Sequence, residues 1–499
     1  MRPNGRFAFW SVWAVFAFGF LLCRWTLFDS VFYNVDEAEY AVAAQALSHH
    51  MLPGLDLVGS TKPPGIVFFY KAIFALAGES VLALQVVGFA LWILLLALTM
   101  KLTERLFPEI PLWMPALSFF LLANSFGPPR DFQALNVELP GIVLVISSYL
   151  LVMGERTPRR VILAGVLFGF AVMFRQSLAL FLLPMWFLFR PADRNKYVRL
   201  GTGIAVPWVL LTIIYAAHGG LSWAYDSWVR FPMLYAGDTG LFGFFEAVRY
   251  STRSVFLQAF VPFTLTAIGI GFAIKRRYVA VLVMTVCATL AVASGSRFFE
   301  HYYIQAFPAF ALLGAIAIWQ LKQISTLLNR LTGAFLAVGA IMALLHFPFW
   351  RYWDTSAPLR GISMESIDLN GLEIELAEFA TQQCTPDERI YVWGYCPQIY
   401  FHSKRLPAAR DYLCEYVTGF SPFSTSPRPY ARPDAMQMLL DDLARNRPAV
   451  IFDLSADEYY EYSFAKYPIV NYPPLADYIK ANYRPAAVVD QVAVYTRAN

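Results

Sequence analysis

The sequence predicts an α-helical membrane protein with many spans that ends in a small α/β domain. The chain is 58% hydrophobic and only 15% charged, whereas a soluble domain has about 25% charged residues. Apolar runs of about 20 residues, the length that crosses a bilayer, recur through most of the chain. After about residue 350 charged residues and prolines become frequent, and no run of that length occurs.

About eleven segments are predicted to span the membrane. They are residues 7–28, 80–100, 111–125, 138–153, 161–175, 177–190, 200–217, 254–274, 278–294, 304–321 and 332–349. Arg2 and Arg6 precede the first segment, which lacks a small-residue cleavage site, so we expect an uncleaved helix with a cytoplasmic N-terminus. Lys and Arg gather in alternate loops, which supports this orientation, and an odd number of spans places the C-terminal region outside.

Two longer outer loops are predicted to carry interfacial helices, within residues 36–78 and 218–253. Residues 36–47 and 65–77 each read as a short helix, and the second loop is rich in aromatic residues such as Trp223 and Trp228. Aromatic side chains gather at the headgroup level of a membrane. We therefore expect a membrane domain over residues 1–350 that includes these two loops.

Residues 351–499 are expected to form an extracytoplasmic α/β domain. Residues 389–394, 449–454 and 487–496 read as strands, and residues 371–383 and 433–445 read as helices. Three of the five cysteines, Cys384, Cys396 and Cys414, lie here. One disulfide with a leftover thiol and three buried reduced thiols both fit an outer compartment.

Charge and motifs exclude several partners. The net charge is only +4 and the basic residues are spread over many short loops, whereas a nucleic-acid binder concentrates them on one face. The sequence has no Gly-rich phosphate loop and no dinucleotide fingerprint. We therefore expect no nucleic acid as partner, and no nucleotide sugar or ATP as substrate.

The first outer loop holds the first group of candidate site residues. Asp36, Glu37 and Glu39 lie where carboxylates would be close to lipid, which is costly and usually serves a function. Asp36 is a candidate general base; it is equally a candidate N-cap, with Glu39 three residues later closing a capping box. Lys62 in Thr61–Gly65 suits a phosphate group, or it is a lysine that snorkels to the interface.

Further candidates lie at the predicted outer ends of other spans. Glu138 opens the fourth predicted span, either as a favourable charge at a helix N-terminus or as a second functional acid. Arg175 lies between two apolar runs and is able to pair with an acid or bind a headgroup. A dense polar cluster over 295–305 includes Arg297, His301 and Tyr302, whose natural role is anion recognition.

These pieces occur together, in this order, in a known family: the chain resembles the membrane glycosyltransferases of the GT-C class. The likeness is greatest to the branch of the protein O-mannosyltransferases and lipid A aminoarabinose transferases. The matching stretches are Tyr33–Glu37, Lys62–Pro64, Asn136–Pro140, Leu163–Gly169, Phe174–Gln176, Arg297–Pro308, Val392–Pro397 and Tyr400. Two positions depart from the family pattern: Glu138 stands where an aspartate is usual, and Arg175 stands where a lysine is usual.

The resemblance implies an inverting glycosyltransferase in the inner (plasma) membrane. Its donor would be a monosaccharide on a polyprenyl phosphate such as undecaprenyl phosphate, and its acceptor a hydroxyl of an extracytoplasmic glycan, glycolipid or protein. Asp36 would be the general base, with Glu37 and Glu138 as further catalytic acids. The residues implied to bind the donor phosphate are Lys62, Arg175, Arg297, His301 and Tyr302.

The resemblance leaves a metal open, since some members of the class use one. A divalent cation would be held by Glu37 and Glu138. The rival interpretations are a polytopic transporter or lipid-linked sugar flippase, and a scaffold that uses the outer domain for binding. A transporter is expected to carry charged or broken-helix sites near the bilayer midplane, whereas the charges here lie at the ends of predicted spans.

Overall fold

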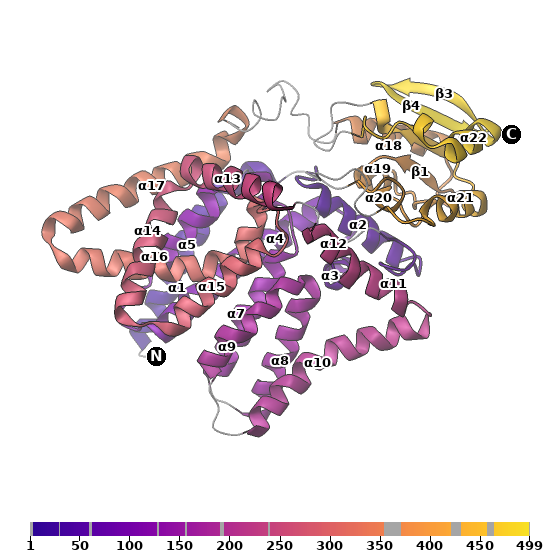
Figure 1. Cartoon of the computed structure of the whole chain (residues 1–499). Helices are drawn as coiled ribbons and strands as arrows, with labels where there is room; N and C mark the ends of the chain where they lie inside the picture. Colours follow the sequence, from indigo (N-terminus) through magenta and orange to yellow (C-terminus); the bar gives the residue numbers. More distant parts are fainter. Residues whose placement is uncertain are drawn as a thin grey trace. The chain divides into compact units, whose positions relative to one another are not determined.

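The computed structural model describes residues 3–28, 30–58, 62–126, 129–154, 157–189, 194–237, 240–353, 371–420, 431–456 and 464–498. The chain divides into two compact units (Figure 1). Unit 1 comprises Met1–Ser30, Leu82–Ile214 and Phe244–Thr355, and unit 2 comprises Val31–Val81, Tyr215–Gly243 and Ser356–Asn499. Each unit is therefore assembled from segments far apart in the sequence.

Unit 1 is built of helices. They are α1 (Pro3–Arg24), α4 (Val81–Leu106), α5 (Trp113–Ser125), α6 (Pro129–Gln133), α7 (Glu138–Met153), α8 (Pro158–Phe174), α9 (Leu182–Phe189), α10 (Arg194–Ala217), most of α13 (Gly240–Gln258), α14 (Phe260–Arg276), α15 (Val279–Ala293), α16 (Phe307–Ile324) and α17 (Thr326–Trp353). The 3₁₀ segments η2 (Gln176–Phe181) and η4 (Glu300–Ala306) precede α9 and α16. All eleven segments predicted as spans coincide with these helices.

Five helices of the described residues are long and apolar enough to cross a bilayer. They are Arg6–Leu27, Val81–Leu106, Arg194–Ala217, Glu300–Ile324 and Thr326–His346. The span that contains α16 is 83% buried inside the protein. By contrast, α1, α10 and α17 expose large apolar residues such as Phe18, Ile213 and Ile341. Apolar side chains exposed along whole helices are stable only against lipid, so the chain is a multi-pass membrane protein.

Glycines allow α8 and α10 to pack backbone against backbone. A Cβ atom on Gly165 would overlap the Leu200 carbonyl oxygen and lie 2.9 Å from the Cα of Gly203. Gly169, one turn later, is closed in by Ile204 and Pro207 in the same way. Small residues at such crossings are typical of membrane helices. The glycines of the Leu163–Gly169 motif therefore have a packing role.

Unit 2 combines short helices with a small mixed sheet. Its helices are α2 (Val35–Leu47), α3 (Gly65–Ala77), α11 (Leu221–Tyr225), a π-helical turn (Asp226–Arg230), α12 (Phe231–Gly237), α18 (Gly371–Gln383), α19 (Pro397–Ser403), α20 (Glu415–Thr418), α21 (Ala435–Asn446) and α22 (Pro473–Asn482). The helices predicted over 36–47, 65–77, 371–383 and 433–445 are confirmed as α2, α3, α18 and α21.

The sheet has the order β1-β2-β4-β3. β1 (Ile390–Trp393) runs parallel to β2 (Val450–Asp453), with Val392 opposite Phe452. β4 (Val492–Arg497) is antiparallel to both β2 and β3 (Tyr483–Val489). The strands predicted near 390 and 450 are confirmed. The prediction of one last strand over 487–496 is wrong, because the chain turns at Asp490 and Gln491, both with positive φ, into a β3–β4 hairpin.

The three cysteines of this region are buried thiols. Cys384, Cys396 and Cys414 form no disulfide. Burial raises the pKa of the Cys384 thiol to about 11. Of the two alternatives that the sequence allowed, three buried reduced thiols is the one observed.

Candidate functional site

The helix that carries Asp36 is capped by another residue. Asn34 has extended backbone angles, and its side-chain oxygen accepts a hydrogen bond from the Asp36 N–H at 2.8 Å. Asn34 is therefore the N-cap of α2, and Asp36 and Glu37 lie in its first turn. The alternative of Asp36 as the cap in a capping box with Glu39 is wrong, and the Asp36 carboxylate is available for other contacts.

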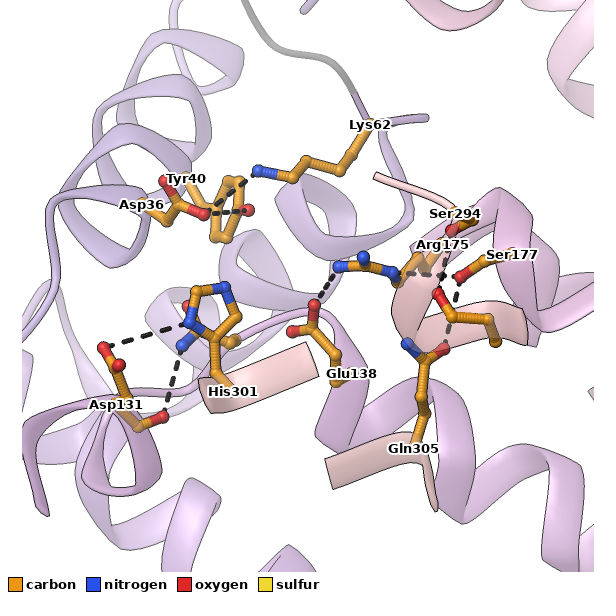
Figure 2. A network of polar contacts seen from close by, with 12 residues as sticks. Asp36, Tyr40, Lys62, Asp131, Glu138, Arg175, Ser177, Ser294, His301 and Gln305 are labelled. Atoms are coloured by element: carbon orange, nitrogen blue, oxygen red, sulfur yellow. Dashed lines mark hydrogen bonds and ion pairs between the residues drawn. The ribbon is translucent and has the colours of Figure 1, made fainter. Parts of the chain in front are cut away.

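Asp36 and Lys62 form an ion pair in unit 2. The Lys62 Nζ donates to Asp36 Oδ2 at 3.0 Å, and the two side chains are 15% and 21% exposed. The Tyr40 hydroxyl, one helical turn after Asp36, donates to the same oxygen at 3.5 Å. The Lys62 ammonium also lies 5.4 Å from the centre of the Tyr40 ring. Figure 2 shows these side chains pointing toward one another.

The neighbouring acids of α2 are more enclosed than Asp36. The Glu37 side chain is fully buried, and Glu39 is 4% exposed. The Tyr412 hydroxyl donates to the Glu39 carbonyl oxygen at 3.4 Å, which ties α2 to the segment before α20 within unit 2. Among the three acids of α2, Asp36 is therefore the one that solvent or a ligand reaches most easily.

Glu138 and Arg175 are ion-paired within unit 1. Glu138 lies in the first turn of α7, where its charge is favoured by the helix N-terminus, and it is fully buried. Arg175, the C-cap of α8, contacts Glu138 Oε1 through Nη1. A buried guanidinium and a buried carboxylate each need the other. Pairing with an acid, one of the two roles predicted for Arg175, is therefore observed (Figure 2).

Other side chains fix the orientation of Arg175. Its Nε donates to Ser177 Oγ at 3.0 Å, and that hydroxyl donates to Gln305 Oε1 at 3.2 Å. The guanidinium carbon lies 3.8 Å from the centre of the Tyr302 ring, in cation–π geometry. Tyr302, predicted as a phosphate ligand, is thus a stacking partner of Arg175.

Arg297 lies in a strained loop between α15 and η4. Its side chain is buried, and the residues on both sides, Ser296 and Phe298, have φ of 56° and 53°. A bulky residue such as Phe298 rarely adopts these angles, and such strain concentrates at functional sites.

His301 follows in η4, with its Nδ1 at 3.9 Å from Asp131 Oδ1 of α6. Its ring stacks on Phe299 with a centroid distance of 5.7 Å. The histidine is 6% exposed, and Figure 2 shows Asp131 facing it.

The predicted residues thus fall into two groups. Asp36, Glu37 and Lys62 belong to unit 2, and the rest belong to unit 1. In the part of the chain that is described, no three His, Cys, Asp or Glu side chains gather as metal ligands. Glu138 is paired with Arg175, and a metal held by Glu37 and Glu138 stays a prediction.

Several contacts escaped the sequence analysis. Tyr40 follows Asp36 by four residues, a helical spacing that brings two side chains together, so it could have been found. Gln305 lies inside the Arg297–Pro308 motif, but its link to Ser177 spans 128 residues. For Glu415, no local sequence pattern indicates a role in the site.

Searches by sequence found no matching family model and no matching curated protein. Comparison with solved structures gives the class: the chain has the fold of the GT-C membrane glycosyltransferases. The crystal structure of apo ArnT from Cupriavidus metallidurans matches with a TM-score of 0.58 at 14% identity, covering 97% of each chain.

Two further structures match along the whole chain. ArnT bound to undecaprenyl phosphate gives a TM-score of 0.57 at 14% identity, over 100% of this chain and 99% of that one. The apo oligosaccharyltransferase of Archaeoglobus fulgidus gives 0.55 at 13% identity, over 100% of this chain and 75% of that one. At these identities the similarity establishes the fold.

Proposed function

We propose that the chain is an inverting glycosyltransferase that moves a monosaccharide from a polyprenyl phosphate to a hydroxyl of an extracytoplasmic glycan, glycolipid or protein. The observation that carries the proposal is the Asp36–Lys62 pair on a GT-C fold, a carboxylate and a cation 3.0 Å apart in the first outer loop. ArnT, which shares the fold, has been crystallised with undecaprenyl phosphate bound.

Asp36 would act as the general base. Its carboxylate would take the proton of the acceptor hydroxyl as that oxygen attacks the anomeric carbon, with inversion. Lys62 would bind the departing phosphate and stabilise the charge that develops on it. Because Asn34 caps α2, the Asp36 carboxylate is not needed to start the helix. Glu37 would be a further catalytic acid, and its side chain is buried.

Three residues of unit 1 are proposed as further phosphate ligands. Arg297 and His301 would bind the phosphate, and the strained backbone around Arg297 supports a role beyond packing. Arg175 would join them, held in place by Glu138 and Tyr302. Lys62 and Arg297 would supply positive charge for the phosphate, the role that a divalent cation has in some members of the class.

The membrane topology belongs to the proposal. About eleven helices would span the inner (plasma) membrane, with the N-terminus cytoplasmic and residues 351–499 as an extracytoplasmic α/β domain. The basic loops at 101–105, 156–160 and 275–277 support this orientation. An active site in the first outer loop would then meet a donor exposed in the outer leaflet.

The test uses purified protein in nanodiscs with a panel of polyprenyl-phosphate sugars and candidate acceptors. Release of polyprenyl phosphate is followed for the native chain, Asp36→Asn and Asn34→Ala. We expect turnover with at least one donor, loss of it in Asp36→Asn, and its retention in Asn34→Ala. If Asn34→Ala and Asp36→Asn lose activity equally, activity depends on the correct start of α2 and gives no evidence that Asp36 is the base. If native protein and Asp36→Asn are equally active, Asp36 is not the base.

A further inference from the structure

A short helix near the C-terminal sheet carries a buried acid, Glu415, in the same unit as the Asp36–Lys62 pair. The helix is α20 (Glu415–Thr418), preceded by Cys414 with φ of 60° and followed by Gly419 with φ of 67°. The Asp411 carboxylate accepts a hydrogen bond from the Val417 N–H at 3.0 Å. The start of α20 is thus held in one orientation by Asp411.

The Glu415 side chain points into unit 2 rather than into solvent. It is 6% exposed, and its Oε2 is buried without a hydrogen-bond partner among the described residues. Burial raises the pKa of the Glu415 carboxyl well above its usual range. The nearby charges of Glu39, Asp411 and Asp36 raise the pKa further, whereas the charge of Lys62 lowers it. Tyr412, three residues before Glu415, donates a hydrogen bond to the Glu39 carbonyl oxygen at 3.4 Å, so this segment packs against α2, the helix that carries Asp36. The Glu415 carboxyl thus lies within electrostatic range of Asp36 and Lys62.

Glu415 does not contribute to the stability of the fold. A buried carboxyl with an unsatisfied oxygen destabilises a protein, and the helix is already capped by Asp411. An apolar side chain would fill the same space at lower cost. Buried polar groups that lack a partner in the free protein are suited to bind a ligand.

The position of Glu415 indicates which part of a ligand it would meet. Under the proposed function Lys62 holds the donor phosphate and Asp36 meets the acceptor hydroxyl. The transferred sugar is bonded to the donor phosphate and is attacked by the acceptor hydroxyl, so it must lie between the groups that Lys62 and Asp36 bind. A carboxyl in range of both is well placed to hydrogen-bond a hydroxyl of that sugar.

We propose that Glu415 is a sugar-binding residue of the Asp36–Lys62 site, and that its carboxyl hydrogen-bonds a hydroxyl of the monosaccharide carried by the donor. Asp411 is the positioning residue that fixes the start of α20 and so aims Glu415. The inference rests on the proposed function, since it names the part of the donor that the C-terminal region recognises.

The experiment compares binding of two ligands that differ only in the sugar. Dissociation constants for a polyprenyl-phosphate monosaccharide and for polyprenyl phosphate alone are measured in nanodiscs, for the native chain, Glu415→Gln and Glu415→Ala. The control is Glu388→Gln, an acid of the same unit that pairs with Arg497 at 2.7 Å. For Glu415→Ala we expect affinity for the sugar-bearing lipid to fall about tenfold or more. Affinity for polyprenyl phosphate should not change.

Each other result has a definite meaning. Equal weakening of both ligands would overturn the proposal, because Glu415 would then act on the phosphate site or on folding. No weakening of either ligand would also overturn it. Glu415→Gln keeps the size of the side chain and serves where Glu415→Ala does not fold. If the native chain binds neither lipid, it is the proposed function that fails.

Discussion

Separating Arg175 from Glu138 should destabilise unit 1, whereas removing both charges should not. The perturbations are Arg175→Met, Glu138→Gln and the double variant. The two side chains are 8% and 0% exposed, so a single change leaves a buried charge without its partner. Such a change costs about 3–5 kcal/mol, while replacing a whole buried pair by neutral groups is often close to neutral.

The assay is thermal unfolding in detergent at a fixed scan rate. At about 2–4 °C for each kcal/mol in a unit of this size, each single variant should unfold roughly 6–20 °C below the native chain. Arg175→Met should be the lower of the two, because it also loses the Ser177 hydrogen bond and the stack on Tyr302. The double variant should recover most of the loss, giving a coupling energy of several kcal/mol.

The same three proteins decide what Arg175 does. If the double variant is stable but binds polyprenyl phosphate weakly, Arg175 contacts the donor and Glu138 is its counter-ion. If the double variant binds polyprenyl phosphate as tightly as the native chain does, the pair is structural and Arg175 is not a phosphate ligand. Single variants that unfold within about 2 °C of the native chain would refute the burial argument itself.

Two further predictions concern stability. Gly165→Ala should lower the unfolding temperature and the yield of folded protein, because its Cβ overlaps the backbone of α10; Gly201→Ala, with no atom within 4 Å of its Cβ, should be harmless. Burial raises the pKa of Asp411 to about 7. The protonated form thus stabilises the fold at low pH, and this contribution is lost as pH rises toward 7, about 3 kcal/mol between pH 5 and pH 8. The unfolding temperature of Asp411→Asn should therefore rise relative to that of the native chain as the pH rises. A difference in unfolding temperature that stays constant with pH would contradict this.

Helices and the outer loops were predictable because their signals are local. An apolar run reports a buried or lipid-facing helix wherever it packs. The β3–β4 hairpin was missed because its turn, Asp490–Gln491, is not one of the dipeptides that favour two successive positive φ angles. β3 also exposes several of its residues and so lacks a clear apolar pattern.

The partners of the site residues were not predictable for a different reason. Asn34 and Asp36 are both good N-caps, and only the extended backbone at Asn34 shows which one is used. Arg175 and Glu138 are 37 residues apart, and the electrostatic interaction between Glu415 and Lys62 joins positions much farther apart in the sequence. No periodicity within a segment reports a contact between segments, so the sequence supplied the charged residues without their pairing.

The Asp36–Lys62 pair implies that donor binding and base activation compete for one ion pair. We expect a phosphate that binds Lys62 to compete with the Asp36 carboxylate for the same ammonium group, and this competition lowers the affinity of the unliganded protein for phosphate. For a partly exposed pair the interaction is worth up to about 1 kcal/mol. Removing the Asp36 charge should therefore tighten binding of polyprenyl phosphate by about two- to fivefold, in a variant that no longer transfers sugar.

This outcome separates the two roles of the pair more cleanly than loss of activity does. A damaged site would bind polyprenyl phosphate more weakly, whereas a site that has lost only its base would bind it more tightly. Titration of Asp36→Asn with polyprenyl phosphate in nanodiscs, beside the native chain and Asn34→Ala, gives the answer. Lys62→Met should weaken binding whether or not Asp36 is present. If Asp36→Asn binds no more tightly than the native chain, Lys62 does not exchange its carboxylate partner for the phosphate of the donor.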